Sequence, residues 1–266
     1  MSEITKPNYL PKIIDSHAHL DFPEFDVDRD VLFQSMKKVG IQTVIIPGVS
    51  PEHWDKQHQI ATQYSCPYAL GIHPWFSDKQ FPNALSELDK RINDSVHDPR
   101  FVAIGECGLD KLHKSDWEVQ ILVLEHQLML AESLNLPVIL HVVKAHNEIM
   151  PLLKRYKLAR GGVIHGFYGS IELATEYVKL GYKLGIGGLI LNSDARKLKD
   201  CITKIPTNSI IIETDSPAMS PKSSLVKRNT PLILPLIIDE IAKLQKKSSV
   251  LITERMFDNA MQLFDL

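Results

Sequence analysis

The sequence predicts a single (β/α)8 barrel, the TIM-barrel class of α/β fold. Eight short apolar runs, typical of buried parallel strands, alternate with longer amphipathic runs along the 266 residues. Polar side chains of the kind that bind metals follow five of these runs. A closed barrel brings the carboxyl ends of its strands together around one axis, whereas an open doubly wound sheet places its ligand at one switch point. The position of these side chains therefore favours the barrel.

The expected strands are short and almost wholly apolar, because strands of a parallel barrel are covered on both faces. In chain order they are Ile13–His17, Thr43–Ile46, Tyr68–Ile72, Val102–Glu106, Val138–His141, Val163–His165, Lys183–Ile186 and Ile210–Glu213.

Helical patterns fill most of the intervals between the strands. Trp117–Leu134 has apolar residues at three- and four-residue steps, and Asn135 is expected to end it. Ile171–Leu180 follows Ser170, a residue type that caps the first turn of helices. Two further helices are expected at Pro231–Leu244 and Thr253–Leu263.

Composition indicates one soluble globular domain over residues 1–266, with a short polar tail at 1–12. The hydrophobic content is 44% and the charged content 23%, both ordinary values. A net charge of −2 excludes a whole-molecule field that attracts nucleic acid, so any such contact must come from a local patch. The tail lacks the apolar centre of a signal peptide, and no run approaches the roughly 20 residues of a membrane span.

Cysteine usage points to a reducing compartment. Cys66, Cys107 and Cys201 are an odd number without metal-type spacing, so we expect packed, reduced thiols in a cytoplasmic protein. Cys107 follows Glu106, and neighbours on a strand face opposite sides. The thiol of Cys107 is therefore expected to point away from any site that contains Glu106.

Six side chains at the ends of expected strands predict a metal centre: His17, His19, Glu106, His141, His165 and Asp215. One histidine after an apolar run is usually a satisfied core residue, but burying six such groups without partners would cost several kcal/mol each. Nitrogen and oxygen ligands without thiolate suit Zn²⁺, Mn²⁺, Mg²⁺ or Co²⁺. Six ligands exceed the needs of one tetrahedral ion, so we expect two divalent ions that share Glu106.

Other side chains are weaker candidates for substrate contacts. His73 ends the third strand and either contacts a phosphate or forms a hydrogen bond within its loop. Trp75 either stacks on a base or packs at the rim. Lys222, Lys227 and Arg228 form a local basic patch or a solvated loop.

Several motifs together resemble the TatD family of metal-dependent deoxyribonucleases, within the amidohydrolase-like barrels. The resemblance extends from Ile13 to about Phe264. The matching segments are DSHAHL (Asp15–Leu20), GIHPW (Gly71–Trp75), IGECGLD (Ile104–Asp110), PVILH (Pro137–His141), IHGF (Ile164–Phe167) and ETDSP (Glu213–Pro217), together with Arg228–Pro231 and Asn259.

The resemblance implies a role for each metal-type residue. His17, His19 and Asp215 would hold one ion, with Glu106 as the bridge to a second ion. His141 and His165 would complete the second site. Glu106 and Asp215 would be the catalytic residues, with Asp215 accepting a proton from the attacking water. The implied activity is hydrolysis of phosphodiester bonds in DNA, single-stranded or bound at an end.

The sequence departs from the family pattern after the fifth strand. The family often has a Ser-Arg pair after this histidine, whereas this chain has Val142 and Val143, then Lys144. We expect Lys144 or His146 to replace the missing arginine as a phosphate contact, with help from Arg228. The departure also keeps an alternative open, a hydrolase of another ester or an amide (a deacylase, deacetylase or lactonase). A metal-stabilised scaffold without activity is disfavoured because all six ligands are present, and no obligate protein partner is expected.

Overall fold

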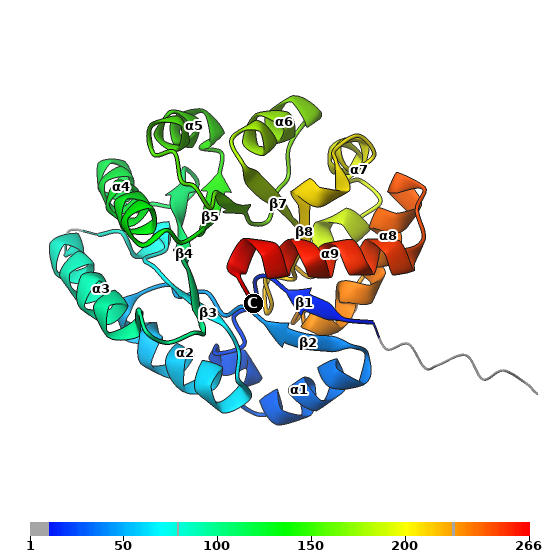
Figure 1. Ribbon diagram of the computed structural model, residues 1–266, viewed down its shortest axis with the longest axis horizontal. Helices are drawn as coiled ribbons and strands as arrows, with labels where there is room; N and C mark the ends of the chain where they lie inside the picture. The colour runs from blue at the N-terminus through cyan, green and yellow to red at the C-terminus, as the bar shows by residue number, and fades with distance from the viewer. Residues whose placement is uncertain (1–10, 79, 225–226) are drawn as a thin grey trace, which may run out of the picture.

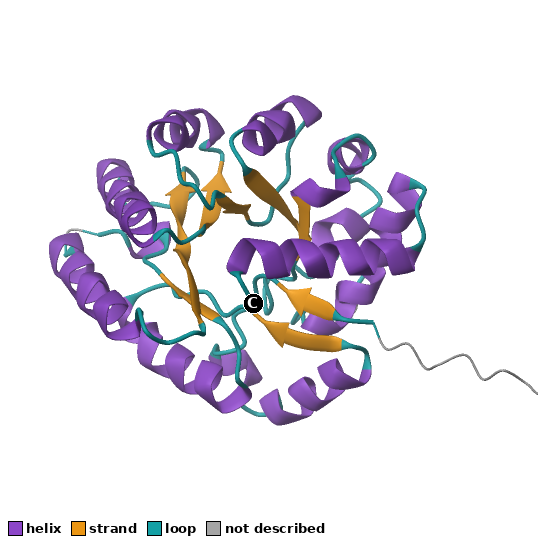
Figure 2. Ribbon diagram, in the orientation of Figure 1, coloured by secondary structure: helices purple, strands orange, loops and turns teal. Residues whose placement is uncertain are grey.

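The computed structural model describes residues 11–78, 80–224 and 227–266. Within these residues, eight strands form a ring that helices surround (Figures 1 and 2). The strands are β1 (Ile13–Asp15), β2 (Ile41–Val44), β3 (Tyr68–Leu70), β4 (Phe101–Asp110), β5 (Val138–Val143), β6 (Gly162–Ile164), β7 (Tyr182–Ile186) and β8 (Ile210–Ile212). The expected tail at 1–12 lies outside the described residues, apart from Pro11 and Lys12.

All neighbouring strands run parallel, and the ring closes. β1 pairs with β2, and β3 to β8 form one continuous sheet in chain order. Between β2 and β3 the ring is joined by a bridge of Ile46 to Tyr68. Between β8 and β1 it is joined by a hydrogen bond of 3.0 Å from the Ser16 N–H to the Ile212 carbonyl. The predicted (β/α)8 barrel is confirmed.

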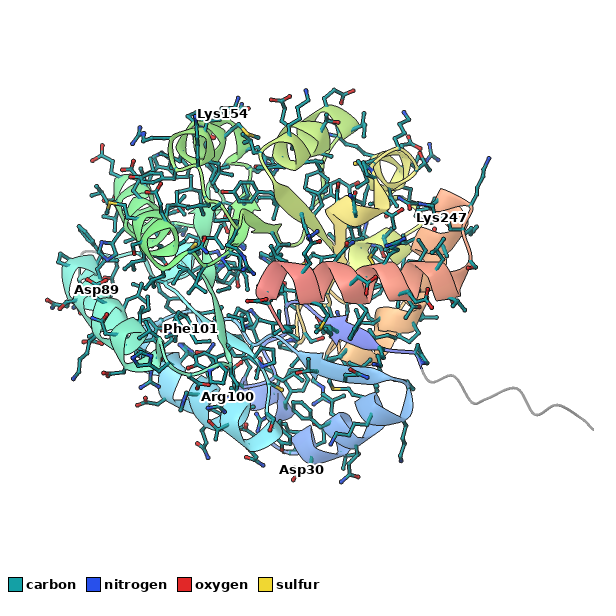
Figure 3. The ribbon with its side chains drawn as sticks, viewed as in Figure 1. Asp30, Asp89, Arg100, Phe101, Lys154 and Lys247 are labelled. Carbon is teal, nitrogen blue, oxygen red and sulfur yellow. The ribbon has the colours of Figure 1, made fainter. Side chains whose placement is uncertain are left out.

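Helices form the outer layer. They are α1 (Arg29–Lys38), α2 (Pro51–Tyr64), α3 (Phe81–Ser95), α4 (Trp117–Leu134), α5 (His146–Arg155), α6 (Ile171–Lys179), α7 (Arg196–Ile202), α8 (Leu234–Gln245) and α9 (Ser249–Phe264). Short 3-10 turns are η1 (Pro23–Phe25), η2 (Pro74–Phe76), η3 (Gly188–Leu191), η4 (Thr207–Ser209) and η5 (Pro231–Ile233). Charged side chains such as Asp30, Asp89 and Lys154 lie at the outer edge of this layer (Figure 3). None of the described helices is long and apolar enough to cross a membrane.

Local capping sets the ends of the helices. The Asp116 side chain accepts from two N–H groups of the first turn of α4, and Asn135 ends α4 in the left-handed conformation at φ 53°. Ser170 caps α6 as expected. α9 is longer than its apolar pattern predicts, because Ser248 caps a first turn that begins at Ser249. The expected helix at Pro231–Leu244 is divided into η5 and α8.

Helix α9 closes the amino-terminal end of the barrel. Apolar side chains from seven strands or strand ends fill the interior in one cluster: Ile14, Ile45, Ala69, Val102, Ala103, Ile139, Val163 and Ile211. Ala260, Leu263 and Phe264 of α9 belong to the same cluster. The Asn259 side chain donates to the carbonyls of Thr207 and Ile210, just before and at the start of β8. Figure 1 shows α9 lying across this end of the strands.

Two strands extend further than expected. β4 continues to Asp110 and β5 to Val143, since the two remain paired from Cys107–Leu140 to Asp110–Val143. Glu106 and His141 therefore lie within strands, not at their ends as predicted. β1 is shorter than expected and stops at Asp15, so His17 and His19 belong to the loop after it.

Candidate active site

The loops after β1 and β8 are joined by backbone hydrogen bonds that bring three metal-type side chains together. The Asp215 N–H donates to the His17 carbonyl at 2.8 Å, and the His19 N–H donates to the Ser216 carbonyl at 2.8 Å. Asp215 has φ 55°, in the left-handed region that few residue types other than glycine and Asn or Asp adopt readily. The Asn229 side chain donates to the Thr214 carbonyl and holds the loop after β8 in place.

One group of donor atoms forms around His17. Its Nε2 lies 3.2 Å from Nε2 of His19, 3.2 Å from Oε2 of Glu106 and 3.4 Å from Oδ1 of Asp215. Nε2 of His19 is 3.4 Å from the same Glu106 oxygen and 3.6 Å from the same Asp215 oxygen. His17 and Glu106 are almost fully buried. Four donors thus converge on one small volume.

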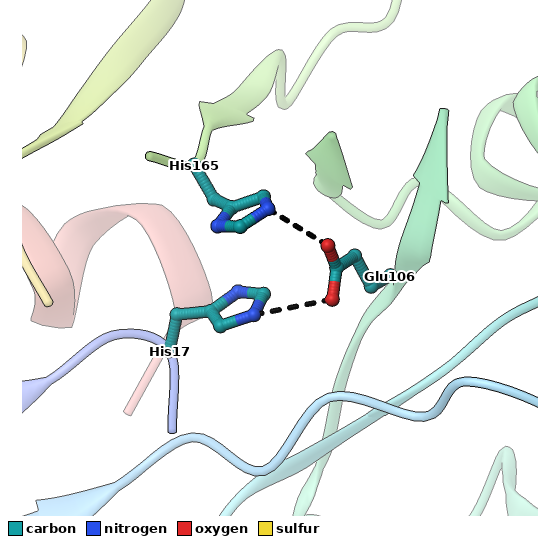
Figure 4. A group of neighbouring side chains, drawn as sticks. All are labelled: His17, Glu106 and His165. Carbon is teal, nitrogen blue, oxygen red and sulfur yellow. Dashed lines mark ion pairs between the residues drawn. The ribbon is translucent and has the colours of Figure 1, made fainter. Parts of the chain in front are cut away.

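A second group forms around the other oxygen of Glu106. Oε1 lies 2.7 Å from Nε2 of His165 and 3.1 Å from Nδ1 of His141, and these two nitrogens are 3.1 Å apart. Figure 4 shows Glu106 between His17 and His165, with one carboxylate oxygen facing each ring. Glu106 therefore contributes to both groups, which is the position predicted for a bridging ligand.

Both groups fit divalent metal ions. Donors held about 2.1 Å from a tetrahedral ion lie about 3.4 Å apart, close to the spacings in both groups. Histidine nitrogens that face each other and a carboxylate need a shared positive charge between their lone pairs. The donors are nitrogen and oxygen, as expected for Zn²⁺, Mn²⁺, Mg²⁺ or Co²⁺. The structure brings all six predicted ligands together.

Burial and charge oppose one another at this centre. Burial alone would lower the pKa of His17, but the Glu106 and Asp215 carboxylates raise that pKa well above its usual value. Burial alone would raise the pKa of Glu106, but the surrounding imidazoles, led by His165, hold that pKa well below its usual value. The carboxylates are therefore ionised and present negative charge that a cation would neutralise.

His141 is oriented by an acid that the sequence analysis did not single out. Oδ2 of Asp110, near the end of β4, lies 3.3 Å from Nε2 of His141 and accepts a 2.7 Å hydrogen bond from Nε1 of Trp75. Burial alone would lower the pKa of His141, but its contacts with the Asp110 and Glu106 carboxylates raise that pKa to about 9. Asp110 lies four residues after Glu106 on the same strand, hence on the same face. It also closes the IGECGLD motif, so the signal was present in the sequence.

Two further buried acids lie behind the metal-type residues. Burial raises the pKa of Glu213 to about 8 and that of Asp15 to about 7. Glu213 accepts from the Gly166 N–H, and its Oε1 lies 3.9 Å from Nδ1 of His165. Asp15 accepts a 2.6 Å hydrogen bond from the Thr214 hydroxyl. Both acids support the loops that carry the ligands and do not line the cavity.

A cavity of about 610 Å³ opens above the donor groups. His19, Glu106, His141, His165 and Asp215 are at its base. The remaining wall is formed by Phe22, Glu24, Val49, His53, His73, Trp75, Phe76, Pro217, Ala218, Lys227 and Arg228. The volume lies within the range of small-molecule sites and exceeds what one phosphate needs.

His73 and Trp75 lie beside the donor groups. Nε2 of His73 is 3.4 Å from Oε1 of Glu106, and His73, Glu106 and His141 are close enough together to hold one ion. Trp75 is 52% exposed, and its ring stacks on His113 with centroids 5.3 Å apart. Its indole N–H is already used by Asp110, which fixes the orientation of the ring.

The expected basic contacts are not brought together. Arg228 lines the cavity, but its guanidinium donates to both oxygens of Asp28, at 2.8 and 2.6 Å, and lies over the Phe25 ring. Lys222 pairs with Asp194 at 2.5 Å. Lys227 lines the cavity and has no ion pair among the described residues. Two of the three cations are thus paired with carboxylates, and among the described residues Lys227 is the one of the three that lines the cavity without such a partner.

Neither residue expected to replace the family arginine reaches the cavity wall. Nδ1 of His146 is 2.9 Å from the Tyr177 hydroxyl, beneath α6. Lys144 is exposed and does not line the cavity. Their proposed phosphate contacts remain predictions without support from this geometry. The three cysteines are free and buried, as expected, and Cys107 does not line the cavity.

Comparison with known proteins agrees with this geometry. Residues 14–265 match the family model described as TatD related DNase. The chain is 34% identical over 257 residues to an uncharacterized metal-dependent hydrolase, YjjV, of Escherichia coli K12, with 96% of this chain and 98% of that protein covered. It is 30% identical to a protein of Erwinia tasmaniensis named 3'-5' ssDNA/RNA exonuclease TatD, covering 96% and 100%.

Solved structures show the same architecture. The crystal structure of Escherichia coli YjjV, a TatD homologue, superposes with a TM-score of 0.92 at 33% identity and covers 97% of this chain and 100% of that one. A TatD family hydrolase of Entamoeba histolytica, at 22% identity, shares the fold with a TM-score of 0.85, covering 96% and 98%. Sequence and fold together show that the chain belongs to the TatD family of metal-dependent hydrolases.

Proposed function

We propose that this hydrolase cleaves phosphodiester bonds of single-stranded DNA at a two-metal centre. The observation that carries the proposal is the position of Glu106, whose two oxygens face two separate groups of donors. Two-metal sites of this kind activate water and clamp phosphate oxygens. The name of the Erwinia relative supports a nucleic-acid substrate and attack at a 3′ end.

The six predicted ligands would hold the two proposed ions. His17, His19 and Asp215 would hold one ion, His141 and His165 the other, and Glu106 both. Bound there, divalent ions lower the pKa of water and neutralise charge on the phosphate. The protein fixes the donors by burial and by the paired loops after β1 and β8, so that little reorganisation is needed.

Asp215 is the proposed general base. Its side chain is 15% exposed, at the base of the cavity, whereas that of Glu106 is 3% exposed. One Asp215 oxygen faces His17 and His19, which leaves the other to accept the proton of the attacking water. Proton transfer of this kind contributes about 10²–10⁴-fold to a rate.

Lys227 and His73 are the proposed phosphate contacts. Lys227 supplies the cavity's cation that the described residues leave unpaired, and His73 lies next to the second donor group. Arg228 is paired with Asp28 and forms part of the cavity wall. This division differs from the sequence expectation, which placed the phosphate contact on Lys144, His146 or Arg228.

The proposal is tested by metal-loaded protein on single- and double-stranded oligonucleotides and on a panel of esters and amides. Hydrolysis of single strands, with 3′-end and 5′-end labels to show polarity, is the expected result. Asp215→Asn should reduce the rate by at least 100-fold while circular dichroism stays unchanged. Equal nuclease activity in the Asn variant, after contaminating nucleases have been removed, would overturn the assignment. Strong ester or amide turnover with none on DNA would replace the proposal by the alternative substrate class.

The three free cysteines support the proposed cytoplasmic location, since secreted proteins tend to pair theirs. Fractionation of cells that express the chain would test it.

A further inference from the structure

An aromatic wall leads away from the metal-type residues along one side of the cavity. The Phe22 ring stacks on the His19 ring with centroids 4.6 Å apart, and His53 lies 6.0 Å beyond Phe22. Phe76 follows at 5.5 Å from His53. Phe22, His53 and Phe76 all line the cavity. The wall therefore begins at His19, one of the metal-type residues, and continues along the cavity through Phe22, His53 and Phe76.

Hydrogen bonds at the start of α2 determine which nitrogen of His53 carries the proton. The Ser50 hydroxyl lies 2.6 Å from Oε2 of Glu52 and 2.8 Å from Nδ1 of His53. A hydroxyl has one proton to donate, and the carboxylate is the stronger acceptor. Ser50 therefore donates to Glu52, and its oxygen accepts from the N–H at Nδ1 of His53. In the neutral ring, Nε2 is then left with a free lone pair.

From this arrangement we propose a subsite for one nucleobase, formed by Phe22, His53 and Phe76, next to the phosphate that is cleaved. Nε2 of His53 accepts a hydrogen bond from an exocyclic amino group of that base. The subsite thus favours adenine, cytosine or guanine over thymine. This inference rests on the proposed function, because it needs a nucleic-acid substrate.

The chemistry of the wall suits a base better than a second phosphate. Aromatic faces stack on any base. The Glu24 side chain lines the same cavity and repels an anion, and Arg228 is neutralised by Asp28. The Trp75 ring already stacks on His113, whereas Phe22 and Phe76 both lie next to His53.

The test uses oligonucleotides that differ by one amino group. Adenine is replaced by purine, which lacks that group, at the last or the second-last nucleotide of a single strand. For wild type, kcat/KM should be about three- to tenfold higher with adenine than with purine at one of these positions. A ratio of this size corresponds to the free energy of one hydrogen bond. His53→Phe keeps a ring and removes Nε2, so the ratio should fall to about one. His58→Phe, the same change on the same helix outside the cavity, should leave the ratio unchanged.

A second variant tests the stacking surface. Phe76 is 40% exposed, so Phe76→Ala is expected to fold. It should lower kcat/KM about 5- to 100-fold for a strand with a base at the sensitive position, and little for a strand with an abasic residue there. A ratio that His53→Phe does not change, or equal losses on both strands in Phe76→Ala, would overturn the subsite alone. A wild-type protein that cleaves no oligonucleotide would instead overturn the proposed function, and the subsite with it.

Discussion

Oδ2 of Asp110 lies 3.3 Å from Nε2 of His141, on the side of the imidazole opposite to Glu106. The ring is thereby held with Nδ1 toward the donor group. Carboxylates in this position fix the tautomer of a ligand histidine and increase its basicity. Asp110 is thus a positioning residue for the donor group of Glu106, His141 and His165.

Replacing Asp110 should weaken metal binding without unfolding the barrel. Asp110→Asn is expected to lower the affinity for one of two ions by about 10- to 100-fold, since outer partners of ligand histidines have effects of this size. Calorimetric titration of metal-free protein would measure it. Trp75→Phe removes the other bond to Asp110 and leaves the carboxylate, so it should have a smaller effect. Equal affinities in wild type and Asp110→Asn would contradict the role.

Removal of metal should destabilise the fold. The six ligands are packed together and carry opposing charges, and an ion that binds only the folded state adds RT ln(1 + [L]/Kd), about 2.7 kcal/mol at 100 times Kd. Chelation should therefore lower the melting temperature, and Zn²⁺ or Mn²⁺ should restore it. Glu106→Gln alters both donor groups, so this variant should lose most of the metal-dependent increase in melting temperature. A melting temperature that does not respond to chelator or added ion would count against a metal centre.

The ion pair between Arg228 and Asp28 should contribute to stability at neutral pH and lose this contribution only in acid. The hydrogen bond from Arg228 holds the pKa of Asp28 below its usual value of about 3.9. A depressed pKa contributes stability that is present above the usual pKa and is lost as the pH falls through the folded-state value. The difference in unfolding free energy between wild type and Asp28→Asn should therefore be constant from pH 5 to 8 and vanish in stronger acid. Because both side chains are partly exposed and water screens the pair, the difference should be a few tenths of a kcal/mol. Denaturant unfolding at several pH values would show it, and a difference that grows toward low pH would exclude this explanation.

The end of the barrel covered by α9 should govern stability and not catalysis. Phe264 is 2% exposed and packs in the barrel interior. Phe264→Ala should cost about 3–5 kcal/mol in unfolding free energy, the usual range for a buried phenylalanine. Activity per folded molecule should stay within about twofold, because residues at the bottom of such barrels mainly stabilise the fold. Leu251 lies on the same helix but is exposed, so Leu251→Ala is the matched control and should change the unfolding free energy little. A large loss of kcat in folded Phe264→Ala would show coupling between the two ends.

The convergence of the six metal-type side chains was predictable because parallel strands place their carboxyl ends at one end of the barrel. Asp110 was missed as a partner because β4 and β5 pair for longer than their apolar runs indicate, so the active face continues past Glu106. Whether Lys222, Lys227 and Arg228 form a basic patch or a solvated loop was left open for a different reason. Arg228 and Lys222 each meet a carboxylate from a distant part of the chain, Asp28 and Asp194, and a sequence pattern does not show such pairs.

The ends of some helices were easier to predict than the contacts between helices. Asn135 and Ser170 mark helix ends through their own conformation and hydrogen bonds to neighbouring backbone groups. Such local interactions can be predicted from one sequence. The hydrogen bond between His146 and Tyr177 depends on how α5 and α6 pack, which local chemistry does not determine.

The helix across the amino-terminal end also determines how molecules move through the site. Leu263 and Phe264 pack in the interior at this end, and the described cavity lies at the opposite end, where the strands point. Under the proposed function, substrate would therefore enter and product would leave on the same side of the barrel. Release of a cleaved nucleotide would then compete with binding of the next strand end.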